Sequence, residues 1–139
     1  MNTAGWLENM EVTILIKNIN LCVWDREFEL PIEYDCYANE KVTREQLSAI
    51  DKFTQNTLKI QESKMFVEKY CKQSLELDKS NQKKNNIFSY IKPDYLYVKR
   101  EEKPRVAIMC KYKYDLEHGI AIVFSQDGEI KVGLQDIIL

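Results

Sequence analysis

Three short apolar runs near the C-terminus limit the folds open to this chain more than any other feature. The runs are RVAIMCKYKY, IAIVF and IKVGL, and the polar breaks DLEHG and SQDGE separate them within residues 105–134. This spacing predicts a three-stranded antiparallel meander. Asp127-Gly128 in the second break predicts a type I′ hairpin turn, because both central residues of that turn need positive φ. Apolar residues alternate in the second and third runs, so one face of these strands should be covered.

Two strands are predicted near the N-terminus, before the two helices that we expect to cover the apolar face of the meander. Residues 12–16 alternate as a first strand that should stop at 18–20, and residues 21–30 predict a second strand. In that second strand Trp24 and Phe28 should point to one face and the acidic residues to the other. Pro31 is expected at its end, where a missing N–H is harmless, with residues 32–37 as a further extended piece.

Two helices are predicted between these strands and the meander. Thr43 and Gln46 form a capping box, so a helix should begin there, with Leu47, Ile50 and Phe53 on one face. At residues 55–57 the helix either breaks and restarts or continues with a bend. A second stripe then runs to about residue 77 and consists of Phe66, Val67, Tyr70, Cys71 and Ser74.

Polar and extended segments follow the helices. Residues 78–86 contain no apolar side chain and predict a solvated loop, residues 87–91 one short helical turn, and residues 95–98 a strand. Strands, two helices and strands again, without regular βαβ alternation, indicate the α+β class. We therefore expect one domain over residues 1–139: a curved, mainly antiparallel sheet with two helices packed on one face.

Composition excludes several classes of protein. The chain of 139 residues is 45% hydrophobic and 30% charged, as in ordinary globular proteins. A net charge of −2 argues against general affinity for nucleic acid, which favours basic domains. No signal peptide is visible, and the apolar runs are shorter than the ~18 residues that span a bilayer. The four scattered cysteines predict reduced thiols and a cytoplasmic location.

Residue types that carry chemistry are sparse. His118 is the single histidine, no nucleophile elbow accompanies it, and the four glycines build no phosphate-binding loop. Asp115, Glu117 and His118 together offer metal-ligand types, but no second spaced cluster supports a metal site. A strand–turn–strand corner explains them better: carboxylates accept local backbone N–H groups, Gly119 supplies an unusual φ, and the imidazole packs on a tyrosine. A polar contact in a partner interface is the other interpretation. We expect no catalytic residue, no metal and no cofactor.

One segment has an unusual charge. Residues 24–40 hold six acidic residues against one basic residue, Arg26, a local charge of −5. Asp25, Glu27 and Glu29 occupy alternate positions of the predicted second strand and should form a row on one face. A solvated sheet face is the simple interpretation. The alternative is a docking surface for a basic partner, because such a field steers association and suppresses wrong partners.

Two stretches resemble a group of small bacterial domains of unknown function. They are WDREFELPIEYDCYANEKVTREQ at residues 24–46 and, within residues 87–134, the segments IFSYIKPDYLYV, DLEHGIAIVF and IKVGL. The most characteristic element of the group is an acidic residue before Glu-His-Gly-aliphatic and a short hairpin, which Asp115, Glu117, His118 and Gly119 match. Such domains resemble those found beside polymorphic or contact-dependent toxin genes, where small acidic proteins serve as immunity factors. The resemblance implies a single α+β domain with no established activity.

These observations lead to one functional hypothesis and two rivals. We expect a non-enzymatic cytoplasmic binding protein, an immunity protein that neutralises a toxin such as a nuclease by occluding a basic surface. Its partner would be a basic toxin domain, with no direct nucleic-acid or membrane binding. The rivals are a structural or regulatory module that forms a homodimer, and an enzyme or metal protein that uses the Asp115–His118 segment. The expected partner-binding residues are Asp25, Glu27, Glu29, Glu33, Asp115, Glu117 and His118.

Overall fold

All strands of the described chain belong to one sheet. A computed structural model describes residues 17–74 and 86–139. The elements are β1 (Asn18–Val23), β2 (Arg26–Tyr34), α2 (Arg44–Gln55), α3 (Thr57–Ser74), η2 (Ile87–Ser89), β3 (Ile91–Val98), β4 (Val106–Tyr112), β5 (Ile120–Phe124), β6 (Ile130–Gly133) and η3 (Gln135–Ile137). The six strands lie in chain order across the sheet. Among the strands of residues 17–74 and 86–139, only β2 and β3 pair in parallel, because both helices are inserted between them. The α+β class and the mainly antiparallel sheet are therefore confirmed.

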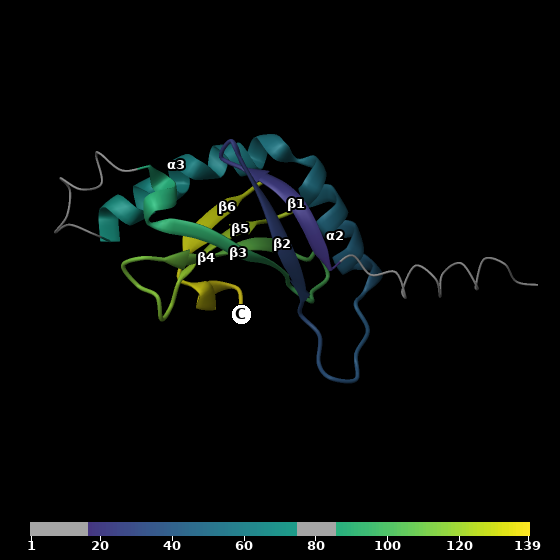
Figure 1. The fold of residues 1–139 in the computed structure, drawn as a ribbon. Helices are drawn as coiled ribbons and strands as arrows, with labels where there is room; N and C mark the ends of the chain where they lie inside the picture. The colour runs from purple at the N-terminus through teal and green to yellow at the C-terminus, as the bar shows by residue number, and fades with distance from the viewer. Residues whose placement is uncertain (1–16, 75–85) are drawn as a thin grey trace, which may run out of the picture.

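The two faces of the sheet have different covers. Both helices lie over one face, here called the helix face, and the C-terminal turn lies on the other, the outer face (Figure 1). α3 contacts both edge strands, β1 and β6, so the sheet curves around it. The main core fills this curve, and its fully buried side chains include Val23, Ile60, Val67, Leu96, Ile108 and Ile122. A smaller cluster on the outer face joins Tyr97, Ala107, Met109, Ala121, Val123 and Ile138.

The first hairpin differs from the sequence-based prediction. Residues 21–30 are not one strand: a two-residue turn at Trp24 and Asp25 separates β1 from β2, with φ of 50° and 67°. Positive φ at both central residues is the type I′ pattern. The prediction was wrong because Trp is not a residue that this turn favours. Residues 18–20, expected to end a strand, begin β1, and the strand predicted at 12–16 lies outside the described residues.

Pro31 lies inside β2 and not at its end, as had been expected. The N–H of Ile32 bonds to the carbonyl of Lys17 on the β1 side at 2.7 Å. Because N–H groups alternate in direction along a strand, the N–H that Pro31 lacks would point towards β3. Pairing with β3 begins only at Ile32, so the proline interrupts no hydrogen bond of that ladder.

The helices follow their capping signals closely. Thr43 Oγ1 accepts the N–H of Gln46 at 3.0 Å, and Gln46 Oε1 accepts the N–H of Thr43 at 2.9 Å, which confirms the capping box. The helix breaks and restarts at Asn56, one of the two alternatives expected. In α3, Val67 and Cys71 are buried as predicted, but Phe66 is 42% exposed. The predicted extension to residue 77 and most of the loop at 78–86 lie outside the described residues.

The segment between α3 and the meander is more extended than predicted. The short helical turn is confirmed as η2, but β3 begins at Ile91, four residues before the strand expected at 95–98. It therefore includes Pro93, and the register with β4 shifts between Pro93 and Tyr95. A bulge of this kind is one of the few places where a strand interior tolerates proline.

The meander is confirmed, with two differences. β4 and β5 are buried on both faces, because the C-terminal segment covers part of the outer face. The β5–β6 turn is not type I′: Gly128, with φ of 96°, has positive φ and Asp127 does not. Instead the N–H of Gly128 bonds to Ser125 O at 3.0 Å, and the N–H of Ser125 bonds to Glu129 O at 2.9 Å. This is a three-residue loop in which glycine takes the left-handed position.

Within the described chain, no helix is long and apolar enough to cross a membrane.

Candidate functional site

The outer face of β2 carries a strip of three exposed carboxylates. Glu27, Glu29 and Glu33 alternate with Phe28, Leu30 and Ile32, which turn to the helix face. We call these three residues the acidic strip. Asp25, which the sequence placed in the same row, is exposed but lies in the hairpin turn and so outside the strand's alternation. Within the described residues, no ion pair involves any of these four acidic side chains.

The neighbours of the acidic strip leave its charge uncompensated. On the β1 side, Cys22 lies opposite Glu27 and Asn20 opposite Glu29. On the β3 side, Tyr97 lies opposite Glu33. Burial, followed by the charges of Asp35 and Glu33, raises the pKa of Tyr97 to about 12. The strip is therefore bordered by neutral side chains, and its negative field reaches the surface with little local screening by protein charges.

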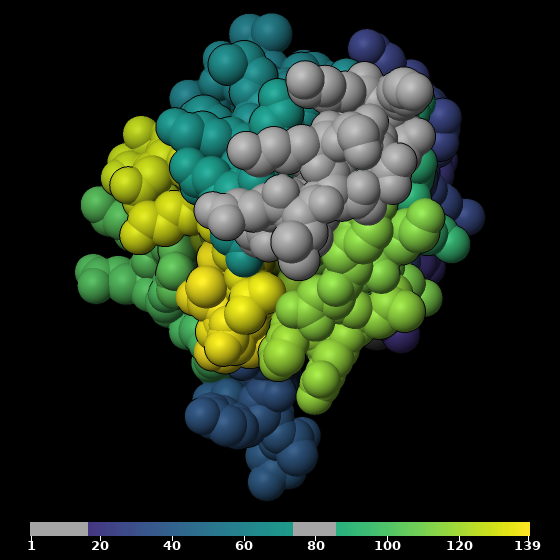
Figure 2. All heavy atoms as spheres, turned by 90° about the vertical axis from the view of Figure 1, so that its left-hand side faces the viewer, coloured from purple at the N-terminus to yellow at the C-terminus, as the bar shows by residue number. Residues whose placement is uncertain are grey.

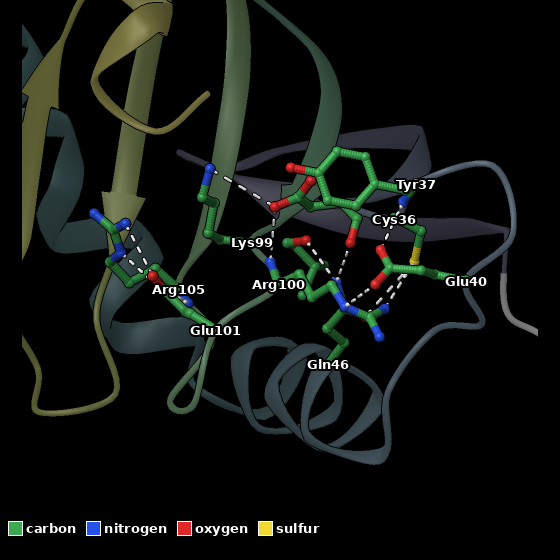
Figure 3. A network of polar contacts seen from close by, with 10 residues as sticks. Cys36, Tyr37, Glu40, Gln46, Lys99, Arg100, Glu101 and Arg105 are labelled. Atoms are coloured by element: carbon green, nitrogen blue, oxygen red, sulfur yellow. Dashed lines mark hydrogen bonds and ion pairs between the residues drawn. The ribbon is translucent and has the colours of Figure 1, made fainter.

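Two other acidic residues of the same segment are neutralised. Asp35 accepts the backbone N–H of Arg100 at 3.0 Å and pairs with Lys99 Nζ at 3.7 Å. Glu40 pairs with Arg100 Nε at 3.4 Å. Figure 3 shows how Arg100 reaches from the end of β3 into the loop that follows β2. The local charge of −5 read from the sequence is therefore divided: among the described residues, Asp35 and Glu40 have cationic partners, whereas Asp25, Glu27, Glu29 and Glu33 have none.

Arg100 also holds the chain between β2 and α2 in place. Its Nη1 donates to the carbonyl of Lys41 at 2.8 Å and lies 3.6 Å from Cys36 Sγ. At the base of the loop, Gln46 Nε2 donates to Asp35 O at 3.0 Å and to Val98 O at 3.2 Å. The loop, blue in Figures 1 and 2, projects from the body, and Tyr37 is 79% exposed. A loop held by side-chain bonds presents its exposed tyrosine at a low entropic cost of binding.

The Asp115–His118 segment forms the corner that the sequence suggested. Asp115 Oδ1 accepts the backbone N–H of His118 at 3.2 Å and lies 3.0 Å from its Nδ1. The hydrogen bond to Asp115, supported by the charges of Asp115 and Glu117, raises the pKa of His118. Gly119 has φ of 61°, as a corner of this type requires. The imidazole contacts a carboxylate, whereas packing on a tyrosine had been expected.

The thiols of the core are poor nucleophiles. Burial raises the pKa of Cys71 to about 11 and also raises the pKa of Cys110. Because the thiolate is the reactive form, both react slowly at neutral pH. All four cysteines are free thiols. Among the described residues, no three His, Cys, Asp or Glu side chains are grouped closely enough to hold a metal ion.

The predicted partner-binding residues thus separate into two groups. Glu27, Glu29 and Glu33 lie on the outer face of β2, whereas Asp115, Glu117 and His118 lie in the β4–β5 loop. That loop adjoins the C-terminal segment, since the N–H of Gln135 bonds to His118 O at 3.3 Å, and Figure 2 shows the two segments side by side. β3 separates β2 from β4, which places these strands roughly 10 Å apart. Sequence reasoning missed the Arg100 network, because no local pattern signals a contact between residues 35–41 and residues 99–100.

Comparison with known proteins yields one match. No curated protein and no solved structure is similar enough to be matched. A family model described as a domain of unknown function, DUF6985, matches residues 2–139. Because this match spans nearly the whole chain, the chain belongs to the DUF6985 family.

Proposed function

We propose that the protein is a non-enzymatic binding protein that docks a basic partner on the acidic strip. The observation that carries this proposal is the run of three exposed carboxylates on one strand face without a protein counter-charge among the described residues. Such a surface speeds encounter with a positively charged partner and disfavours negative ones. Lysine or arginine side chains are the natural complement, since carboxylates pair with guanidinium groups through two parallel hydrogen bonds.

The projecting loop extends the proposed docking surface. It follows β2 directly, and its exposed Tyr37 is a residue type that often dominates binding energy at interfaces. The Arg100 contacts hold the loop before the partner arrives, which lowers the ordering cost of association. Strip and loop together would combine electrostatic steering with one aromatic anchor.

The biological role that we propose is that of an immunity protein. In this role the acidic strip would occlude the basic cleft of a toxin domain, such as the phosphate-binding cleft of a nuclease. The resemblance of residues 115–119 and of the hairpin after them to domains found beside toxin genes supports this role. Four free thiols, two of them buried, fit our proposal that the protein acts in the reducing cytoplasm.

Co-expression with the neighbouring gene product tests the role. If that product carries a toxic C-terminal domain, cells that express both proteins should grow, and cells that express the domain alone should not. A gene located in a metabolic operon, or growth arrest in the presence of both proteins, would refute the immunity role.

Charge reversal tests the docking surface. Glu27→Lys, Glu29→Lys and Glu33→Lys together should slow association at low salt by about tenfold or more, and added salt should reduce this difference. Glu62→Lys, Glu102→Lys and Glu129→Lys change the net charge equally and serve as the matched control. Equal association rates for the two triple variants would exclude the acidic strip but not a binding role.

The rival proposal is a structural or regulatory module that forms a homodimer. Such a dimer could pair through the edge of β1, but Gln61 Nε2 already donates to the Cys22 carbonyl on this strand at 3.2 Å. β6, the other edge, has only four residues and carries Lys131. Short edges and charged side chains hinder edge pairing. Sedimentation velocity at micromolar concentration should give a monomer, and a stable dimer would favour the rival.

A further inference from the structure

A groove opens where α2 ends and α3 begins, on a part of the molecule that the docking proposal does not use. The chain turns at Asn56 between the two helices, and the β5–β6 turn faces this junction across the groove. Its volume is about 140 Å³. The lining residues come from α2, the helix junction, α3, the segment that leads into β4, and the β5–β6 hairpin: Ala49, Lys52, Phe53, Asn56, Lys59, Pro104, Val106, Phe124, Ser125, Gln126, Gly128 and Glu129.

The floor of the groove is apolar. Phe53 and Phe124 meet edge to face with their ring centroids 5.0 Å apart, and Val106 lies in the same buried cluster. Ala49 contributes only a methyl group, and Gly128 has no side chain, so space remains above the two rings. An apolar group that entered this space would contact aromatic surface and displace water from it.

The rim of the groove carries more positive than negative charge. Lys52 lies in the last turn of α2, and Lys59 lies near the start of α3, whose first turn has no acidic residue. Glu129 is the acidic residue of the lining, and Lys131 Nζ approaches it at 3.8 Å. Lys59 Nζ is 3.6 Å from Glu62, a contact between exposed groups that costs little to break. Lys52 is exposed and Lys59 is half-exposed beside Gly128, so both ammonium groups can reach an anion at the mouth.

We propose that this groove binds a small organic acid. Its apolar part, a single ring or a branched chain, would lie on Phe53 and Phe124, and its carboxylate would lie between Lys52 and Lys59. The size of the groove favours such a ligand, because sites for larger molecules have volumes of ~300–1,000 Å³. The charge favours an acid over an alcohol or an amine of the same shape. The ligand would be distinct from the basic partner proposed for the acidic strip.

Titration with small probes, followed by amide chemical shifts, tests the proposal. Phenylacetate and 4-methylpentanoate should give saturable shifts confined to the residues around the groove. The neutral analogue 2-phenylethanol should bind about tenfold more weakly, and 2-phenylethylamine should give no saturable shift at these residues. Absence of saturable shifts with both acids, or equal affinity for phenylacetate and 2-phenylethanol, would overturn the proposal.

Substitution of lysines tests whether Lys52 and Lys59 bind the carboxylate of the ligand. Lys52→Met and Lys59→Met each should weaken phenylacetate binding about two- to fivefold, as expected for exposed charge pairs. Lys92→Met and Lys111→Met remove the same charge from the opposing positions of β3 and β4 and should leave the affinity unchanged. Equal effects of the two pairs of variants would show a nonspecific dependence on net charge and would overturn the site.

A larger side chain at position 49 tests whether the ligand lies on the apolar floor of the groove. Ala49→Leu should abolish saturable binding by occupying the space above the two phenylalanines. If this variant does not fold, the lysine variants still decide the question, because their side chains are exposed or half-exposed. The triple variant of Glu27, Glu29 and Glu33 should bind phenylacetate normally, so failure of the docking proposal and failure of this one are separable.

Discussion

The indole N–H of Trp24 lies 3.1 Å from the carbonyl oxygen of Ile60, and 3.1 Å from Ser63 Oγ. Trp24 occupies a left-handed turn position with φ of 50°, yet its side chain is only 4% exposed. A non-glycine residue in this region costs about 1–2 kcal/mol. Burial of the indole between η2 and α3, with Phe88 at 5.5 Å between ring centroids, offsets that cost. Trp24 thus joins the first hairpin to α3, in addition to the bond from Gln61 to the Cys22 carbonyl.

Trp24→Phe should lower the free energy of unfolding by about 2–4 kcal/mol. The variant keeps the strained backbone, loses the hydrogen bond to the buried Ile60 carbonyl and leaves a cavity. Urea denaturation followed by far-UV circular dichroism measures the change. Asp25→Gly at the next turn position, where φ is 67°, should change stability by less than about 1 kcal/mol. A larger loss for Asp25→Gly than for Trp24→Phe would contradict this account.

Gln46→Ala should destabilise the protein by about 2–4 kcal/mol. The buried amide accepts from Thr43 N and donates to the carbonyls of Asp35 and Val98, so its removal breaks three hydrogen bonds, although the Val98 carbonyl still accepts the N–H of Asp35 at 2.9 Å. Thr43→Ala removes only one bond of the capping box and should cost about 1 kcal/mol. Both values come from chemical denaturation. Equal losses would show that the contacts of Gln46 beyond the helix cap contribute nothing.

Gly119→Ala should cost about 2–4 kcal/mol, more than Gly128→Ala. Both glycines have positive φ, so either alanine is strained by about 1–2 kcal/mol. At Gly119 a Cβ would also lie 2.7 Å from the Cys110 carbonyl oxygen, whereas at Gly128 the nearest atom is Lys59 Nζ at 3.6 Å. Thermal or urea unfolding of the two variants decides between strain alone and strain plus overlap. Equal losses of stability in the two variants would show that the overlap with the Cys110 carbonyl oxygen contributes nothing.

The single histidine makes the Asp115 contact measurable by pH titration. The hydrogen bond to Asp115 raises the pKa of His118 above its ordinary value of 6.5. A group with a raised folded-state pKa contributes stability below the unfolded-state pKa and loses it as the pH rises through the folded-state value. The β4–β5 loop should therefore be best ordered at acidic pH and loosen slightly towards pH 8. NMR titration of the imidazole should show the raised pKa, and Asp115→Asn should lower it; an unchanged value would contradict the pairing.

The four thiols should separate into two classes. Cys22 and Cys36 are partly exposed, whereas Cys71 and Cys110 are buried and have raised pKa values. In the native protein a thiol reagent should modify two equivalents quickly and the other two only on unfolding. Cys22→Ser and Cys36→Ser should each remove one fast equivalent. Modification of all four thiols at one rate would show that the core opens readily.

Local patterns in the sequence determined the elements whose signals lie within a few residues of one another. Alternation at residues 120–124 and a glycine at 128 suffice for a hairpin, and Thr43 with Gln46 suffices for a helix start. The charge pattern likewise predicted that Glu27 and Glu29 share a face, but it placed Asp25 in the same row, and Asp25 lies in the hairpin turn. The type of turn was not predicted correctly: the Asp-Gly pattern indicated a type I′ turn, whereas the structure has a three-residue loop.

Tertiary structure alone decided the features that depend on contacts between distant residues. A tryptophan enters a left-handed turn because Ile60 and Ser63, far along the chain, bind its side chain. Asp35 has a cationic partner and Glu33 has none among the described residues, because Lys99 and Arg100 follow the end of β3 next to Asp35. The groove exists because a helix junction and a hairpin turn face each other. The propensity of a segment for helix, strand or turn depends on a few neighbouring residues. The burial of a side chain and the compensation of its charge depend on residues that are distant in sequence, and only the fold brings these residues together.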